Sequence, residues 1–175
     1  MSDEIKNRVA ESGLITIDLE QWLEAVSFAS FDLTSLLWQG LVLREKDLRE
    51  FLKTQPVDLY TGKVLYMNIP SDVIIPQWTH LLIGSHFGLH CSGFYVGDQV
   101  HAASSYLKKL INDMDVNQYQ DRMVIIKGCT KAFVTREIQS ELLQKLLPVV
   151  KSLTYGEPCS TVPLYKKNKI SLKID

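Results

Sequence analysis

The chain has 175 residues, of which 46% are hydrophobic and 22% are charged, and its formal net charge at pH 7 is −1. These values are ordinary for a globular protein that buries a sizeable core. A nearly neutral chain is not expected to bind nucleic acid, whose phosphates require a concentrated basic surface. No apolar run is long enough to span a bilayer, so no membrane protein is expected either.

The N-terminus and the cysteines predict a cytoplasmic protein. Met1 is followed by acidic residues rather than by the basic and then apolar run of a signal peptide. The cysteines are Cys91, Cys129 and Cys159, an odd number without CxxC spacing. They do not resemble the disulfide framework of a secreted domain, so we expect reduced thiols.

The first third of the chain is predicted to be irregular and rich in helix. A helix is expected at residues 3–13, and alternating apolar and polar residues predict a half-buried strand at 15–19. A second extended piece is expected at 26–31. Residues 44–53 predict a stronger helix, with one apolar face and opposite charges at i,i+4 spacing on another. We expect this third of the chain to cover the remainder.

From Gly62 onward, strand and helix signals alternate. Strands are predicted at residues 63–69, 94–96 and 123–127, and helices at 76–87, 98–114 and from Thr135 to a stop near Gly156, with a kink at Pro148. This alternation implies right-handed βαβ units. The fold class predicted is therefore α/β, with a Rossmann-like three-layer core and a mainly parallel sheet. No linker divides the chain, so residues 1–175 are predicted to form a single domain.

Ligands of open α/β sheets bind beyond the carboxyl ends of the strands. That rule selects three loops, at residues 70–72, 97–98 and 128–131. The polar and small candidates in or beside them are Ser71, Asp72, Asp98, Lys127, Gly128 and Thr130.

Cys129 lies in the last of these loops, between Gly128 and Thr130. A thiol that leads toward a helix N-terminus tends to have a lowered pKa, which favours a nucleophile or a metal ligand, and Lys127 would add to this effect. The alternative is a small buried residue at a tight turn. The sequence leaves both interpretations open.

The C-terminal block at residues 155–166 combines two prolines with polar candidates, namely Glu157, Cys159, Ser160 and Thr161. It either folds back toward Cys129 or is a rigid segment that docks the C-terminus. A last helix that runs to Gly156 would carry Cys159 away from Cys129. We therefore expect residues 160–165 to return along the sheet, and a metal site shared by the two thiols is the weaker expectation, since two cysteines alone do not complete a tetrahedral zinc site.

The four histidines, His80, His86, His90 and His101, lie near one another in the sequence. His86 and His90 have the i,i+4 spacing of a helical metal pair, but the glycine between them indicates that the helix ends there. Exposed or packing histidines are the favoured interpretation, and a metal site is the other.

The sequence resembles the DUF2480 family, bacterial proteins found largely in Bacteroidetes. The resemblance covers nearly the whole chain and is carried by residues 7–16, 40–47, 75–78, 125–129 and, most specifically, 156–166. It implies no activity by itself. It does imply an association with sulfur mobilisation and iron–sulfur cluster assembly, because genes of the family often lie beside genes for those processes. The chain departs from the family at His80, where the family has an aromatic residue, so His80 is a poor candidate for a shared ligand.

Two functions are compatible with these observations. The first is an accessory factor in iron–sulfur cluster assembly or sulfur transfer, in which Cys129 and Cys159 bind a metal or cluster or carry sulfur. The second is a non-catalytic interaction module that docks a protein partner or a second copy of itself, with structural cysteines. Whether the chain is an enzyme stays open, since the dinucleotide, P-loop and serine-hydrolase motifs are absent from the sequence. An enzyme that uses Asp72 or Asp98 ranks last because neither has a paired acid or base.

Overall fold

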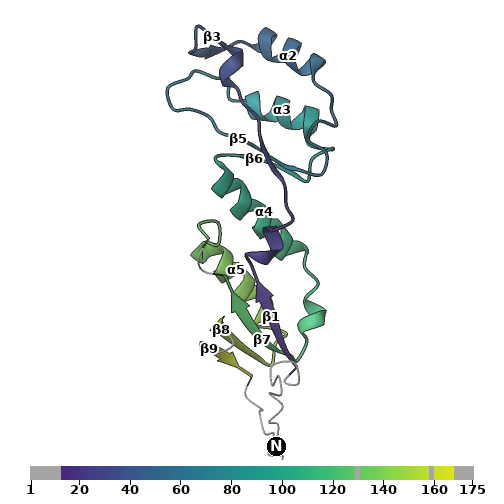
Figure 1. The fold of residues 1–175 in the computed structure, drawn as a ribbon, viewed down its shortest axis with the longest axis vertical. Helices are drawn as coiled ribbons and strands as arrows, with labels where there is room; N and C mark the ends of the chain where they lie inside the picture. The colour runs from purple at the N-terminus through teal and green to yellow at the C-terminus, as the bar shows by residue number, and fades with distance from the viewer. Residues whose placement is uncertain (1–12, 129–130, 158–159, 168–175) are drawn as a thin grey trace, which may run out of the picture. The chain divides into compact units, whose positions relative to one another are not determined.

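The computed structural model describes residues 13–128, 131–157 and 160–167 (Figure 1). The chain divides into two compact units, which we describe separately. The terminal unit comprises Met1–Trp22 and Lys108–Asp175, and the central unit comprises Leu23–Leu107. Both contain mainly parallel strands with helices, which confirms the predicted α/β class. That residues 1–175 form one domain stays a prediction.

The central unit is built on a parallel sheet with the strand order β2-β5-β6. Its strands are β2 (Phe28–Ser30), β5 (Val64–Met67) and β6 (Gly93–Val96), its helices are α2 (Glu45–Thr54), α3 (Thr79–Phe87) and the start of α4 (Gln99–Asp113), and β3 (Leu37–Trp38) pairs with β4 (Val42–Leu43) as an antiparallel hairpin. Leu65 and Met67 of β5 are fully buried, as expected for the middle strand of a covered parallel sheet. Leu48 of α2 and Phe87 of α3 complete the same core.

The terminal unit is built on a sheet with the strand order β1-β7-β8-β9. Its strands are β1 (Leu14–Asp18), β7 (Met123–Lys127), β8 (Ser152–Glu157) and β9 (Ser160–Lys166). The first three are mutually parallel, and β9 returns antiparallel to β8 as a hairpin. Helix α5 (Arg136–Leu146) connects β7 to β8.

Helix α5 begins where the sequence predicts and ends much earlier. The hydroxyl oxygen of Thr135 accepts a hydrogen bond from the backbone N–H of Ile138 at 3.3 Å, which caps the first turn. The helix ends at Leu146, because the following turn contains Pro148, which has no N–H to continue the ladder. The prediction that the helix runs to Gly156 is wrong, and Gly156 instead lies within β8.

The remaining strand predictions are confirmed, and the structure adds their pairing. The strands predicted at 63–69 and 94–96 pair in the central unit, whereas the strand predicted at 123–127 pairs in the terminal unit. The first third contributes β1 and β2 to the two sheets, so it is more than cover. Residues 3–12 of the helix predicted at 3–13 lie outside the described residues. Among the described helices, none has the length and apolar character needed to cross a membrane.

Candidate functional site

Three parallel strands of the terminal unit end side by side. Asp18, the last residue of β1, lies opposite Lys127, the last residue of β7. On the other side of β7, Ile126 lies opposite Tyr155 of β8, so Glu157 follows at the same edge. This carboxyl edge is the one at which open α/β sheets bind ligands.

An ion-pair cluster closes this edge. Lys127 Nζ lies 3.0 Å from Glu157 Oε2 and 3.6 Å from Asp18 Oδ2. The hydrogen bond to Glu157, followed by the charges of Glu157 and Asp18, raises the pKa of Lys127, so the amine is firmly protonated at neutral pH. Two carboxylates balance this one cation. That balance weakens the expectation that Lys127 promotes a thiolate at Cys129.

Gly128 makes a tight turn directly after β7. Its φ is +101°, and a Cβ placed on it would lie 3.3 Å from Leu19 Cβ and 3.4 Å from Glu20 Cγ. Its carbonyl accepts a hydrogen bond from Gln139 Nε2 at 3.2 Å. The backbone N–H of Lys131 donates to Glu20 Oε1 at 3.3 Å, so the loop is held both before and after residues 129–130.

An open groove of about 440 Å³ lies beside this edge, between α5 and the β8–β9 hairpin, and we call it the α5–β9 groove. Ile126, Tyr155 and Val162 lie in a row on one face of the sheet, because each is the register partner of the next. Ile126 is 2% exposed, Tyr155 is half-buried and Val162 is 60% exposed. Helix α5 therefore covers β7 and leaves β9 uncovered, with Leu164 of β9 on the wall of the groove and 48% exposed.

The polar wall of the groove comes from α5. Gln139 Nε2 donates to the hydroxyl of Tyr155 at 3.3 Å, in addition to its bond to the turn. The hydroxyl of Ser140 donates to the carbonyl of Arg136 at 2.8 Å. Arg136 is the first residue of the helix, where the macrodipole is positive, and its side chain is exposed. Among the described residues, no carboxylate forms an ion pair with Arg136.

The predicted cysteine site falls largely outside the described residues. Cys129, Thr130 and Cys159 belong to residues 129–130 and 158–159, so a shared site stays a prediction. The geometric objection to it no longer applies, because α5 is short and β8 returns to the carboxyl edge of β7. The segment 160–165 does return along the sheet, as β9, and it begins with the exposed Ser160 and Thr161.

The other predicted loops belong to the central unit. Ser71 and Asp72 lie exposed in the turn that follows β5. Asp98 precedes α4, and its Oδ1 accepts a hydrogen bond from the backbone N–H of His101 at 2.8 Å, so it caps that helix. The loops at 70–72 and 97–98 therefore do not share a sheet edge with Gly128. Strands β5 and β6 belong to one sheet and β7 belongs to another.

The histidines do not form a metal site in the described part of the chain. Helix α3 ends at Phe87, so His86 and His90 do not share a helical face. In the described ranges there is no group of three or more His, Cys, Asp or Glu side chains that could hold a metal ion.

The α5–β9 groove was not predicted from the sequence. Arg136, Gln139, Ser140 and Leu143 have the i, i+3, i+4, i+7 spacing of one helical face, which was the available signal. It was hidden because residues 152–157 were assigned to the end of that helix rather than to a strand beside it.

A family profile described as "Protein of unknown function (DUF2480)" matches residues 3–167. The chain belongs to the DUF2480 family. The match covers nearly the whole chain, including the β8–β9 hairpin and α5. No curated protein and no solved structure matches the chain.

The backbone conformation of Gly128 predicts that any side chain at this position lowers the stability of the protein. Gly128→Ala should lower the free energy of unfolding by on the order of 1–3 kcal/mol, since both the backbone conformation and the approach of Leu19 oppose a Cβ. Gly13→Ala is the control in the same unit, because Gly13 also has a positive φ but no described atom lies within 4 Å of its Cβ position. Urea denaturation should show the larger loss for Gly128→Ala, and equal losses would refute the close approach.

The ion-pair cluster predicts a pH-dependent contribution of Glu157. Because folding raises the pKa of Lys127, the stabilisation is complete below the unfolded lysine value of about 10.4 and is lost as the pH rises through the folded pKa. Glu157→Gln should therefore destabilise the protein at pH 8 and have a vanishing effect well above pH 10.5. The control is Glu45→Gln, whose partner Arg49 does not lose its charge in this range. A Glu157→Gln effect that is constant with pH would contradict the assignment.

Proposed function

We propose that this DUF2480 protein is a non-catalytic interaction module that binds an extended acidic segment of a partner protein in the α5–β9 groove. The partner places an apolar side chain against Leu143, Tyr155 and Leu164, and a neighbouring carboxylate meets Arg136. The observation that carries the proposal is the uncovered face of β9 beside an open groove with an apolar floor.

The apolar part of the groove supports a protein ligand. Val162 and Leu164 are large apolar side chains exposed side by side on one strand, next to the half-buried Leu143 and Tyr155. Contiguous apolar surface that is rimmed by polar groups is typical of protein interaction sites. Burial of one leucine-sized side chain is worth roughly 1.5–3 kcal/mol, which is enough to anchor a short segment.

The charge of the groove supports an acidic segment. Arg136 presents a guanidinium at the positive end of α5, and a carboxylate there gains both a charge-assisted hydrogen bond and the helix dipole. The other polar groups, Gln139 and Ser140, are already engaged with Tyr155 and the helix backbone. Gln139 and Ser140 therefore form part of the wall, and Arg136 is the residue that binds the carboxylate of the partner.

The sequence of strand β9 favours a partner that docks on its side chains over a partner that adds a strand to the sheet. It is the edge strand of its sheet, and an edge normally offers a row of N–H and C=O groups to another strand. Pro163 lies in the middle of β9 and has no N–H, which interrupts that row. The same interruption disfavours the pairing of β9 with a second copy of itself.

Ser140 of the groove and Lys127 of the adjoining carboxyl edge also favour binding over catalysis. The Ser140 hydroxyl donates to a backbone carbonyl rather than to a base, and Lys127 is held protonated by two carboxylates. A nucleophile needs an adjacent base or a lowered pKa, and neither condition is met by these two residues.

The experiment is selection of a phage-displayed peptide library on the full chain, followed by titration of a synthetic consensus peptide by fluorescence anisotropy. The consensus should contain an apolar residue adjoining Asp or Glu. Arg136→Glu and Leu164→Asp should each weaken binding about ten-fold or more, a loss of at least about 1.4 kcal/mol. Lys151→Glu is the matched control, because it makes the same charge change at the opposite end of β8.

Two results would overturn this proposal. The first is the absence of a consensus, or equal affinity of the wild type and Arg136→Glu for the selected peptide. The second is a dimer in sedimentation velocity that Leu164→Asp dissociates, which would make a second copy of the chain the occupant.

The sulfur-transfer function is a second proposal, favoured by one observation. Cys129 and Cys159 each follow by two residues a member of the 3.0 Å Lys127–Glu157 pair. For that function, cytoplasmic protein purified without oxygen should contain iron, zinc or a persulfide, measured by metal analysis and mass spectrometry. The Cys129→Ser variant should lose the metal or persulfide. Cys91→Ser is the control and should retain it. Protein that carries none of these would contradict a chemical role for the thiols and leave them structural.

A further inference from the structure

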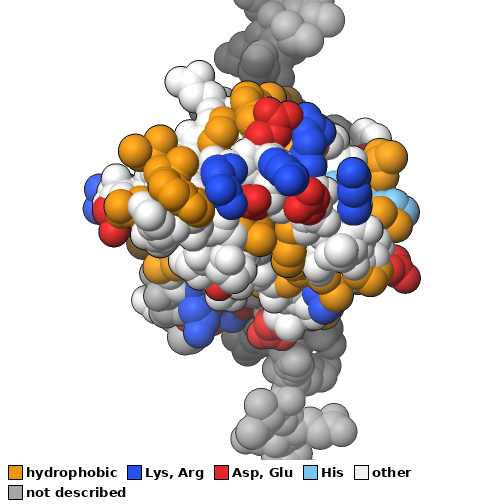
Figure 2. Space-filling model, turned by 90° about the horizontal axis from the view of Figure 1, so that it is seen from above, with side chains coloured by type: hydrophobic (Ala, Val, Ile, Leu, Met, Phe, Trp, Pro, Cys, Tyr) orange, Lys and Arg blue, Asp and Glu red, His pale blue; other side chains and the backbone are white. Residues whose placement is uncertain are grey.

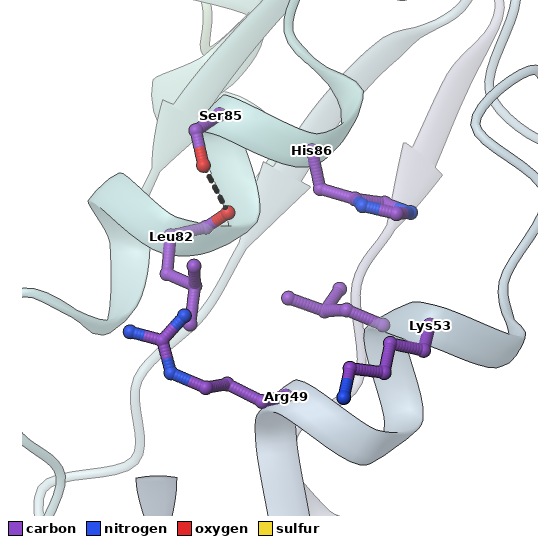
Figure 3. Close-up of a pocket in the computed structure, with 6 residues that line it drawn as sticks. Arg49, Lys53, Leu82, Ser85 and His86 are labelled. Carbon is purple, nitrogen blue, oxygen red and sulfur yellow. Dashed lines mark hydrogen bonds between the residues drawn. The ribbon is translucent and has the colours of Figure 1, made fainter. Parts of the chain in front are cut away.

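The central unit contains a second pocket, of about 200 Å³, between α2 and α3. It is open to solvent and lined by Arg49, Leu52 and Lys53 of α2 and by Leu82, Ser85 and His86 of α3 (Figure 3). We call it the α2–α3 pocket. The interaction proposed for the α5–β9 groove makes no use of it.

Two cations of α2 reach this pocket from successive turns. Arg49 and Lys53 have i,i+4 spacing, and Figure 3 shows both along the lower side of the pocket, below Leu82 and His86. Arg49 donates to Glu45 Oε1 at 2.7 Å through Nε, which leaves its terminal amino groups for a further acceptor. Lys53 has no hydrogen bond or ion pair with any residue that the structure describes.

The unbalanced charge of Lys53 is unusual on its helix. Figure 2 shows Lys and Arg side chains interspersed with Asp and Glu on the face viewed. The other cations of α2 and its N-cap are paired: the N-cap residue Arg44 lies 2.6 Å from Asp47, and Lys46 lies 3.8 Å from Glu50. The α2–α3 pocket is therefore the place on this helix where positive charge exceeds negative charge.

The wall opposite the cations is fixed and largely apolar. The His86 ring lies with Nε2 3.2 Å from the carbonyl oxygen of Gln55, and because a carbonyl only accepts, this nitrogen carries the hydrogen. That bond ties α3 to the end of α2. The Ser85 hydroxyl donates to the Leu82 carbonyl at 2.8 Å, and the side chains of Leu52 and Leu82 are buried and half-buried.

We propose that the α2–α3 pocket binds a small organic oxyanion. The guanidinium of Arg49 and the ammonium of Lys53 bind the charged oxygens, since a guanidinium fork matches a carboxylate or phosphate group and an ammonium adds a point charge. The carbon skeleton of the ligand lies against Leu52 and Leu82. A volume of about 200 Å³ limits the ligand to a small molecule rather than a polymer.

The test is an NMR titration of the ¹⁵N-labelled full chain at constant ionic strength with phenyl phosphate, benzoate, inorganic phosphate and phenol. Saturable shifts are expected for amides in residues 49–55 and 82–87. Phenyl phosphate should bind at least several-fold more tightly than inorganic phosphate because its ring contacts the leucines, and phenol should give no saturable shift. Tighter binding of phenyl phosphate would identify the ligand as a phosphate ester, and tighter binding of benzoate would identify it as a carboxylate.

Lys53→Gln and Arg49→Gln should each weaken the binding of the tighter ligand about ten-fold. Lys46→Gln is the matched control, because Lys46 lies on the same helix, is 81% exposed and pairs with Glu50. The proposal is overturned if neither phenyl phosphate nor benzoate gives saturable shifts in these residues, or if Lys46→Gln weakens binding as much as Lys53→Gln does.

Discussion

Helix α5 is narrower than the four-stranded sheet of the terminal unit, and this difference determines which side chains of the sheet stay exposed. One connecting helix follows β7, and it buries Ile138, Leu142 and Leu146 against that part of the sheet. The β8–β9 hairpin then adds an antiparallel strand outside the helix. Along the row from Ile126 through Tyr155 to Val162, side-chain exposure rises from 2% at Ile126 to 60% at Val162, because the helix covers β7 and does not cover β9. A sheet one strand wider than its cover must leave apolar surface in solvent, and here that surface forms one side of the α5–β9 groove.

Ion pairs connect the strand ends at the carboxyl edge next to the groove. Lys127 sits between Asp18 and Glu157, and this arrangement joins the ends of three neighbouring strands by charge. Exposed ion pairs contribute little individually, but here one cation is shared by two carboxylates from different strands. Gly128 adds a second constraint, because its backbone approaches Leu19 and its carbonyl receives Gln139. Gln139 in turn bonds to Tyr155, so the turn, the helix and the wall of the groove form one connected network.

The α/β class and most of the strands could be predicted from the sequence, because each signal is local. Residues 123–126 form an unbroken apolar run, and Thr135 is the N-cap of the helix that directly follows it. The pairing of strands is not local, and the assignment of β5 and β6 to one sheet and β7 to another could not be inferred from periodicity. The stop at Leu146 could have been inferred from Pro148, but the apolar residues that follow continue the helical spacing and concealed β8. Consequently Lys127, Gly128 and Glu157 were identified as site candidates, whereas Arg136, Tyr155 and Leu164 were not.

The proposed binding surface consists of the uncovered face of β9 and the adjoining side of α5. Hydrogen–deuterium exchange of the full chain, with and without a saturating selected peptide, locates the residues that the peptide protects. We expect slower exchange at residues 136–143 and 153–165 on peptide addition, with unchanged exchange at 45–54 of the central unit. Protection confined to the central unit, or absent from both α5 and the β8–β9 hairpin, would contradict it.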